Sequence, residues 1–199
     1  MAYEIQTIAV VGAGERGRQI ATAALLAGCR TILEDISETR LEEAAASFSR
    51  LGEEARSRLV TASTVEEAVR GADLIIEAVA EEMEMKIELF TIFDKFAKPH
   101  AILASSSPAL SIADMASVTF CAERCIGMRF AGAAEGRNVL ELVCTPETSE
   151  ETVAACREVA RRMSKQAVVL SEAAVASEAG RNPRTRRGLP QGRSSLESR

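Results

Sequence analysis

Short apolar segments and longer amphipathic segments alternate along the chain. The apolar segments are rich in Val, Ile and Leu, which is typical of buried strands. They cover residues 5–11, 31–34, 59–62, 73–79, 101–104, 125–130, 139–143 and 167–170. The amphipathic segments carry apolar residues at helical spacing and cover residues 16–27, 37–50, 84–96 and 149–163. This order predicts an α/β fold, a doubly wound, mostly parallel sheet with helices on both faces.

The alternating pattern ends after residue 171. The remaining residues, 172–199, hold prolines and glycines among six arginines, and they show no periodicity that could bury a core. We therefore expect one domain over residues 1–171 and a disordered basic tail over residues 172–199. A basic docking arm is the functional alternative for this tail.

The composition is that of a globular protein, with 47% hydrophobic and 27% charged residues. The formal net charge is −5, and it is −8 for the part before Ser171 because the rest carries six Arg against three Glu. An acidic body of this kind disfavours a nucleic-acid partner. No apolar run is long enough to span a membrane, and the first residues lack the pattern of a leader peptide, so we expect a cytoplasmic protein.

Five cysteines are scattered through the expected elements, and the chain has one histidine, His100. Cys121 and Cys125 form the one close pair, and the sequence offers too few further ligands to complete a zinc site around them. We expect free thiols and no metal site.

A glycine-rich turn follows the first expected strand. Gly12, Gly14 and Gly17 have the G-x-G-x-x-G spacing, between a buried strand and a helix. In that context the first glycine makes a tight turn, the second lets the backbone approach a diphosphate, and the third lets helix and strand pack closely. The start of the helix supplies free N–H groups and a positive dipole to the phosphates. The segment predicts a Rossmann-type dinucleotide-binding domain, and Arg16 and Arg18 add positive charge there.

An acidic residue at the end of the second strand completes this pattern. Asp35 stands where a carboxylate accepts hydrogen bonds from the hydroxyl groups of the adenosine ribose. The same carboxylate would repel the 2′-phosphate of NADP, so the sequence favours NAD as the cofactor. Glu34, its neighbour, is expected to face the other way on the strand. The alternative is that the glycine-rich turn joins strand and helix and holds no ligand.

Further motifs carry a resemblance to a known family. They are residues 72–79 (ADLIIEAV) followed by Glu81 and Lys86, residues 110–112 (LSI), residues 126–128 (IGM) with Phe130, and residues 140–143 (LELV). Each motif alone is common, but their joint occurrence in this order is specific. Over roughly residues 5–171 the chain resembles the 3-hydroxyacyl-CoA dehydrogenase family.

This resemblance implies that the three glycines hold NAD together with Asp35, Glu81 and Lys86. It also implies hydride transfer from a 3-hydroxyacyl-CoA to NAD, with a histidine as the base and a glutamate that orients it. Glu141 matches the glutamate and is the candidate catalytic residue, but Arg129 stands at the histidine position. A guanidinium stays protonated and cannot take the hydroxyl proton.

Other substrate contacts of the family also differ in this sequence. The catalytic serine of the family aligns with Pro108, and an asparagine aligns with Gly132. His100 precedes a strand, so we expect it at the edge of the sheet opposite the ligand-binding ends. Glu141 beside Arg129 predicts an ion pair, and a purely structural role for Glu141 is the alternative.

The resemblance further implies a small-molecule substrate, an acyl-CoA, and a homodimer built through a C-terminal helical domain. The polar tail stands in place of that domain, so we expect a truncated or frame-shifted product. Three hypotheses stay open. The chain is a 3-hydroxyacyl-CoA dehydrogenase-like oxidoreductase with an intact cofactor site and a degraded catalytic set, a non-catalytic NAD-binding module that acts by association, or a dehydrogenase of another small hydroxy acid that Arg129 binds.

Overall fold

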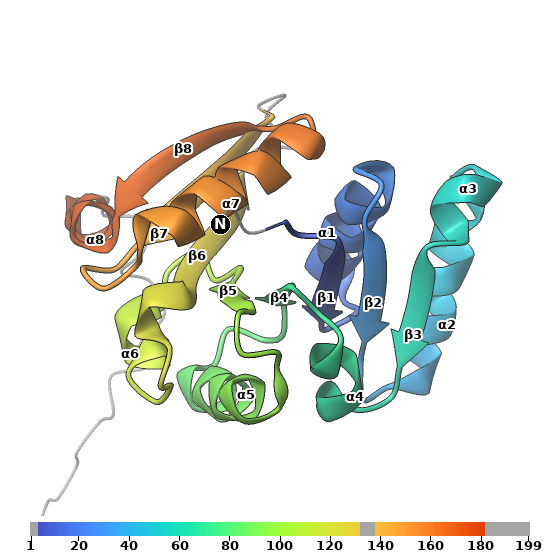
Figure 1. The fold of residues 1–199 in the computed structure, drawn as a ribbon, viewed down its shortest axis with the longest axis horizontal. Helices are drawn as coiled ribbons and strands as arrows, with labels where there is room; N and C mark the ends of the chain where they lie inside the picture. The colour runs from blue at the N-terminus through green and yellow to red at the C-terminus, as the bar shows by residue number, and fades with distance from the viewer. Residues whose placement is uncertain (1–3, 132–137, 182–199) are drawn as a thin grey trace, which may run out of the picture.

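The computed structural model describes residues 4–131 and 138–181 of the chain. Within these residues eight strands form one sheet (Figure 1). The strands are β1 Thr7–Val11, β2 Arg30–Glu34, β3 Leu59–Ala62, β4 Leu74–Glu77, β5 Ile102–Ser105, β6 Cys125–Ala131, β7 Val139–Cys144 and β8 Gln166–Ser171. Their order is β3-β2-β1-β4-β5-β6-β7-β8, and neighbouring strands are parallel except β6 and β7, which are antiparallel.

The order of the strands reverses at β1. The chain runs outward from β1 to β2 and β3, returns to β4 on the other side of β1, and continues outward to β8. In doubly wound sheets, ligands bind where the order reverses, outside the carboxyl ends of the strands. The structure therefore confirms the predicted Rossmann-type, mostly parallel sheet, and its topology places a ligand crevice at the ends of β1, β2 and β4.

Helices cover both faces of the sheet. Those of the described residues are α1 Glu15–Leu26, α2 Glu38–Ser47, α3 Glu53–Arg56, α4 Val65–Arg70, α5 Met83–Phe96, α6 Ile112–Ala116, α7 Glu150–Arg162 and α8 Glu172–Arg181, with 3₁₀ turns at Phe48–Arg50 and Ala122–Arg124. Residues of α1, α2 and α7 share one apolar core with one face of the sheet. Residues of α4, α5 and α6 share a second core with the opposite face, and these three helices lie along the lower side of Figure 1.

The central strand β1 contributes to both cores. Ile8 and Val10 belong to the core of α1, α2 and α7, whereas Ala9 and Val11 belong to the core of α4, α5 and α6. Successive side chains of a strand point to opposite faces, so a strand covered on both faces has to be apolar at every position. This explains the unbroken apolar runs from which the sheet was predicted.

All predicted strands and all four predicted helices are present, with ends that differ by up to three residues. Helical periodicity missed α3, α4 and α6, because four to six residues are too few to show a repeat. Two of these helices carry N-cap residues that could have revealed them. Thr64 accepts a hydrogen bond from Glu67 N at the start of α4, and Ser111 accepts one from Asp114 N at the start of α6.

The disordered tail expected from residue 172 is wrong for its first ten residues, because these form α8. Alanine and glutamate dominate this segment, and both favour helices. The prolines and glycines that follow the segment favour disorder and hide this helical preference. The Glu172 side chain accepts hydrogen bonds from Ile112 N and Ala113 N, which ties the start of α8 to the start of α6. The rest of the predicted tail, residues 182–199, and Gly132 lie outside the described residues.

Candidate functional site

The turn between β1 and α1 requires glycine at two positions. Gly12 has a φ of +105°, and a Cβ there would lie 2.8 Å from the carbonyl oxygen of Ala78. A Cβ on Gly17 would lie 1.7 Å from the carbonyl oxygen of Gly12. By contrast, nothing lies within 4 Å of a Cβ built on Gly14. Gly12 and Gly17 therefore shape the turn, and Gly14 leaves open space in front of it.

The start of α1 faces this open space. Gly14 is the N-cap of the helix, its backbone is extended, and no side chain caps the helix there. The N–H groups in the first turn of a helix have no partners within the helix, and the dipole of the helix makes this end positive. An anionic group such as a diphosphate therefore fits at this position.

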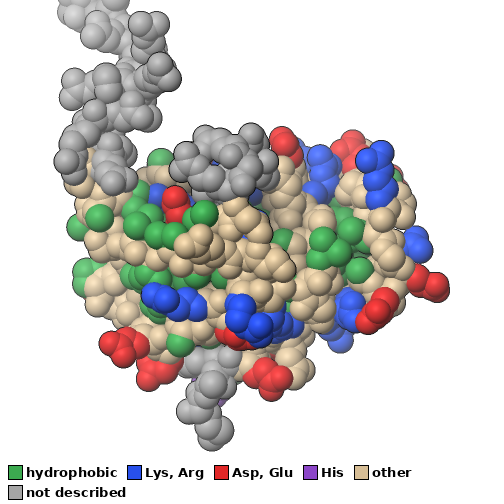
Figure 2. All heavy atoms as spheres, turned by 90° about the horizontal axis from the view of Figure 1, so that it is seen from above, with side chains coloured by type: hydrophobic (Ala, Val, Ile, Leu, Met, Phe, Trp, Pro, Cys, Tyr) green, Lys and Arg blue, Asp and Glu red, His purple; other side chains and the backbone are tan. Residues whose placement is uncertain are grey.

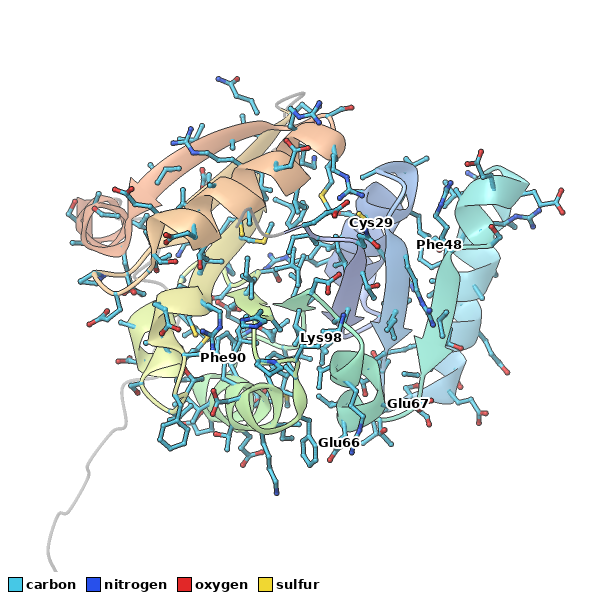
Figure 3. The ribbon with its side chains drawn as sticks, in the orientation of Figure 1. Cys29, Phe48, Glu66, Glu67, Phe90 and Lys98 are labelled. Atoms are coloured by element: carbon cyan, nitrogen blue, oxygen red, sulfur yellow. The ribbon has the colours of Figure 1, made fainter. Side chains whose placement is uncertain are left out.

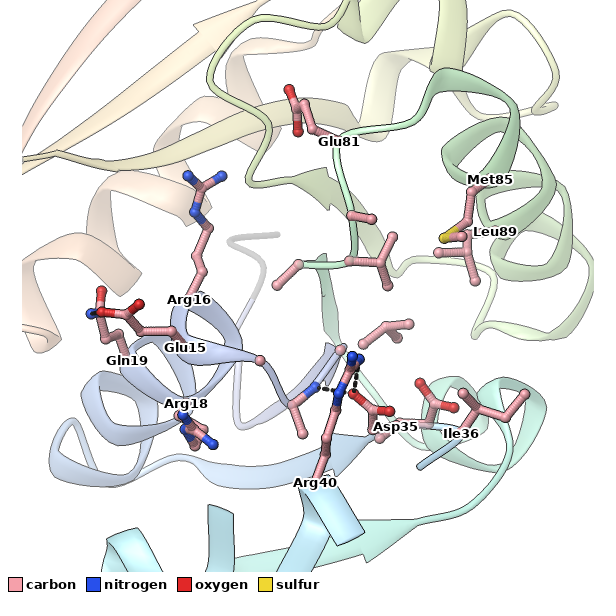
Figure 4. Close-up of a pocket in the computed structure, with 18 of the residues that line it drawn as sticks. Glu15, Arg16, Arg18, Gln19, Asp35, Ile36, Arg40, Glu81, Met85 and Leu89 are labelled. Atoms are coloured by element: carbon pink, nitrogen blue, oxygen red, sulfur yellow. Dashed lines mark hydrogen bonds and ion pairs between the residues drawn. The ribbon is translucent and has the colours of Figure 1, made fainter. Parts of the chain in front are cut away.

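A cleft of about 1140 Å³ lies at the same place (Figure 4). Its walls are the β1–α1 turn, the segments that follow β2 and β4, and side chains of α2 and α5. The cleft thus opens at the carboxyl ends of the strands, where the topology predicts a ligand. Pockets for small ligands usually measure roughly 300–1,000 Å³, so this cleft is large enough for a dinucleotide.

Asp35 lies at the edge of this cleft, directly after β2. Its carboxylate accepts hydrogen bonds from Ala13 N at 2.8 Å and from Ser37 N at 2.9 Å. Nη1 of Arg40 lies 3.6 Å from Oδ2 of Asp35, and Figure 4 shows Arg40 reaching over the carboxylate. These contacts hold the carboxylate beside the glycine turn, where the sequence predicted it.

Glu34 also lines the cleft, which the sequence did not predict. Alternate residues of a strand share a face, so Glu34 lies on the same face of β2 as Ile32, which belongs to the core of α4 and α5. Leu33 lies on the opposite face, in the core of α1, α2 and α7. The orientation of Glu34 does not remove it from the cleft, because β2 ends there. Burial, followed by the charges of Asp35 and Glu66, raises the pKa of Glu34 to about 7. An acidic residue at the last position of a strand that ends at the crevice was the available signal.

Glu81 and Lys86 differ in their access to the cleft. Glu81 lines it and accepts a hydrogen bond from Oγ of Ser107. Lys86 is 1% exposed, and its Nζ lies 2.6 Å from Oε1 of Glu77 and 3.5 Å from Oε2 of Glu81. The other oxygen of Glu77 accepts a hydrogen bond from Ser105 at 2.7 Å. Lys86 therefore lies between Glu77 and Glu81 and is not among the residues that line the cleft, so its predicted contact with the cofactor stays a prediction.

Arg129 and Glu141 are direct cross-strand partners on β6 and β7. The predicted ion pair between them is wrong, because no charged nitrogen of Arg129 lies within 4.0 Å of a carboxylate oxygen of Glu141. Instead Nε of Arg129 donates a hydrogen bond to the carbonyl oxygen of Ser107 at 2.8 Å. The guanidinium has turned to the loop after β5, while the two residues keep neighbouring positions in the sheet.

Burial lowers the pKa of Arg129, and the carboxylates of Glu141, Glu172 and Glu81 act against this shift. An arginine has so high an ordinary pKa that it remains a cation in either case. The charges of three acidic side chains therefore act on one fixed positive charge, at the position where the resemblance implies a base.

The other residues that sequence reasoning placed around the substrate lie as follows. Pro108 lines the cleft, next to Ser107. His100 is exposed and precedes β5, so it lies at the amino end of that strand, away from the cleft, as predicted. The position aligned with the catalytic serine thus faces the cleft without a hydroxyl group.

Arg16 and Arg18 bring positive charge to the cleft, which both of them line. Nη1 of Arg16 donates a hydrogen bond to the carbonyl oxygen of Ser106 at 2.9 Å. Nη1 of Arg18 lies 3.4 Å from Oε2 of Glu43. In Figure 4 Arg16 points toward the Glu81 end of the cleft, and Arg18 lies nearer the Asp35 end.

Taken together, the residues present fit a dinucleotide. The open space at Gly14 and the uncapped start of α1 suit a diphosphate, and the carboxylate of Asp35 suits a sugar with two free hydroxyl groups. Residues 4–131 and 138–181 hold no cluster of three or more His, Cys, Asp or Glu suited to a metal ion. In those same two ranges, every helix falls short of the length and apolarity needed to cross a membrane.

Known proteins are similar to this chain in sequence. A family profile described as 3-hydroxyacyl-CoA dehydrogenase, NAD binding domain, matches residues 7–173. A Bacillus subtilis protein named "Probable 3-hydroxybutyryl-CoA dehydrogenase" is 34% identical over 183 residues, which cover 85% of this chain and 63% of that protein. The mitochondrial hydroxyacyl-coenzyme A dehydrogenase of Rattus norvegicus is 28% identical over 183 residues, covering 82% of this chain and 58% of the relative.

Solved structures agree with the sequence comparison. The crystal structure of 3-hydroxybutyryl-CoA dehydrogenase from Escherichia coli matches with a TM-score of 0.77 and 28% identity, over 84% of this chain and 38% of that one. The chain thus spans less than two thirds of the length of these relatives. Because the family profile matches most of the chain, the protein belongs to the 3-hydroxyacyl-CoA dehydrogenase family and carries its NAD-binding domain.

Proposed function

We propose that the cleft binds NAD with its diphosphate on the turn of Gly12, Gly14 and Gly17 and its adenosine ribose at Asp35. The observation that carries this proposal is the open space at Gly14 in front of an uncapped helix start. Two backbone N–H groups hold the carboxylate of Asp35 in place, and its negative charge repels the 2′-phosphate of NADP, so NADP binds more weakly.

Glu81 contacts the nicotinamide half of the cofactor in this proposal. Figure 4 shows Glu81 and Asp35 at opposite ends of the drawn cleft, which supports this separation of roles. Lys86 acts as a positioning residue, because its ammonium group lies between Glu77 and Glu81 and is itself buried. When bound, NAD supplies the acceptor for a hydride.

The reaction that we propose is oxidation of a 3-hydroxyacyl-CoA, at a rate far below that of an ordinary dehydrogenase. Glu141 stands opposite position 129, as a glutamate that orients a base would, but Arg129 cannot accept the hydroxyl proton. Pro108 offers the substrate no hydroxyl group. The domain therefore retains the cofactor site and lacks the proton acceptor, and Glu141 is left without a histidine to orient.

A non-catalytic NAD-binding module is the second candidate. Arg129 donates a hydrogen bond to Ser107, and the charges of Glu141, Glu172 and Glu81 act on its guanidinium. Both observations favour a structural role for this arginine. A dehydrogenase that uses Arg129 to bind a carboxylate is disfavoured, because Nε of Arg129 already donates to Ser107 and the charges of three glutamates act on the guanidinium. The homodimer and the cytoplasmic location stay predictions.

Two measurements on the purified chain test the proposal. Calorimetric titration should give saturable binding of NAD and at least tenfold weaker binding of NADP. Production of NADH from 3-hydroxybutyryl-CoA should be barely above the background of the reagents. Equal affinity for NADP would reject the role of Asp35, and turnover at ordinary dehydrogenase rates would reject the degraded catalytic set.

A further inference from the structure

Glu34 is a buried carboxyl group that the proposed cofactor contacts leave unused. It ends β2, and its carbonyl oxygen accepts a hydrogen bond from Gly12 N at 2.8 Å, which fixes its backbone beside the glycine turn. The residue is 5% exposed and lines the cleft. Among the described residues, none donates a hydrogen bond to its side chain or forms an ion pair with it. A ligand in the cleft that donates to or accepts from this carboxyl group therefore gains a hydrogen bond that no protein group competes for.

The charges nearest to Glu34 are negative. Asp35 follows it in the chain, and Glu66, which Figure 3 labels on α4, acts on it electrostatically from the first turn of that helix. The neighbouring strands β1 and β3 contain no charged residue. Burial and these two carboxylates raise the pKa of Glu34 to about 7, so the group carries a proton in a large share of molecules at neutral pH.

The nearby cations are already engaged. Arg40 of α2 lies over Asp35 at 3.6 Å, and Arg18 of α1 lies 3.4 Å from Glu43 of α2. None of the ion pairs among the described residues includes Glu34, so a proton can take the place of a cation on this carboxyl group.

A protonated carboxyl group has one donor and one acceptor side by side. The side-chain amides of Asn and Gln have the same pair, and they bind adenine through its amino group and the adjacent ring nitrogen. Two apolar side chains, Ile36 and Val65, line the same cleft and offer surfaces for a flat base. The carboxyl group directly precedes Asp35, the proposed partner of the adenosine ribose.

We propose that Glu34 contacts the adenine ring of the cofactor as a protonated carboxyl group, which selects adenine nucleotides and makes their affinity depend on pH. This inference rests on the proposed NAD site. Loss of the proton removes the donor and adds a negative charge next to an anionic ligand. Affinity therefore falls as the pH rises through neutrality.

Calorimetric titration of NAD and of ADP-ribose into the full chain tests this role. Both ligands should bind about fivefold more weakly at about pH 8.5 than at about pH 6, which is the loss expected for one hydrogen bond. ADP-ribose lacks the nicotinamide, so an equal loss for both places the effect at the adenosine end. Binding near pH 8 should also take up protons, seen as a heat that changes with the ionisation enthalpy of the buffer.

Three variants complete the experiment. Glu34→Gln keeps a donor and an acceptor but cannot titrate, so its affinity should be independent of pH and its binding should take up no protons. Glu66→Gln removes one of the charges that favour the proton, so the fall in affinity should begin at lower pH. Glu42→Gln changes an exposed carboxylate of α2 outside the cleft and should behave like the unmodified chain.

Each outcome decides between the claims. If NAD does not bind at either pH, the proposed function itself is rejected. If NAD binds with an affinity that is constant or rises with pH, or if Glu34→Gln keeps the pH dependence, the NAD site stands and the role of Glu34 is rejected.

Discussion

The two halves of the sheet differ in the kind of chemical group that each offers a ligand. The half around β1, β2 and β4 offers mainly backbone groups, at the glycine turn and the start of α1. Its one side chain in this set is the carboxylate of Asp35, which a backbone N–H group holds in place. The half around β5, β6 and β7 presents side chains, with Arg129 opposite Glu141 and Pro108 at the cleft. Backbone chemistry persists as long as the turn folds, whereas one substitution changes side-chain chemistry and leaves the fold intact.

This difference explains how the cofactor site fits NAD while the proposed catalytic set is incomplete. The cross-strand register that pairs position 129 with Glu141 is in place. In the proposed function, the scaffold of the reactive half is present without its reactive group. Substitutions in the two halves should accordingly have different effects, and those expected to be largest come first.

The largest effect is expected from Gly17→Ala. A Cβ at this position would lie 1.7 Å from the carbonyl oxygen of Gly12, and backbone cannot yield as a flexible side chain can. We expect a loss of more than about 3 kcal/mol in the free energy of unfolding, together with loss of NAD binding. Urea denaturation measures it, and a variant as stable as the unmodified chain would show that the turn is looser than described.

Arg129→His should raise the rate of NADH formation from 3-hydroxybutyryl-CoA by about a hundredfold, the usual contribution of a positioned base. Histidine would stand directly across from Glu141, the residue that matches the orienting glutamate. Arg129→Gln is the matched control, since it removes the charge and adds no base. Equal rates in the two variants would show that position 129 does not limit the reaction.

Gly14→Ala separates ligand binding from folding. Nothing in the protein lies within 4 Å of the added Cβ, so we expect the melting temperature to change little. The methyl group would occupy the space proposed for the diphosphate, and NAD affinity should fall at least tenfold, about 1.4 kcal/mol. Unchanged affinity would place the diphosphate elsewhere.

The smallest effect concerns the stability of the free protein. Because the pKa of Glu34 is raised to about 7 in the fold, the proton stabilises the folded chain at low pH. That contribution is lost as the pH rises from the ordinary range of a glutamate through 7. Glu34→Gln should therefore be more stable than the unmodified chain at pH 8, and the difference should shrink as the pH falls to 4. Urea melts at both pH values would reveal it, and a gain that is the same at both would contradict the shifted pKa.

Sequence patterns could predict the parts of the molecule that depend on local chemistry. The apolar runs of β1 and β4 follow from burial on both faces, and the turn of Gly12 and Gly17 follows from close backbone contacts. The pattern did not predict the helices α3, α4 and α6, because helices this short depend on caps and packing and show no repeat of apolar residues. The helix α8 was not predicted, because the prolines and glycines that follow it favour disorder over the whole segment.

Side-chain contacts between distant segments were harder to predict. The sequence shows Arg129 and Glu141 as neighbours in the sheet, but it does not show that the carbonyl oxygen of Ser107 competes for the guanidinium. It also does not show that Lys86 is enclosed between Glu77 and Glu81. Both outcomes depend on the loop after β5 and on α5, which only the assembled fold brings together.

A crystal structure of the chain grown with NAD tests the central claim most directly. We predict a diphosphate within hydrogen-bonding distance of the N–H groups at the start of α1 and an adenosine ribose whose hydroxyl groups contact Asp35. Density for NAD at another place, or a diphosphate that avoids Gly14, would contradict the account.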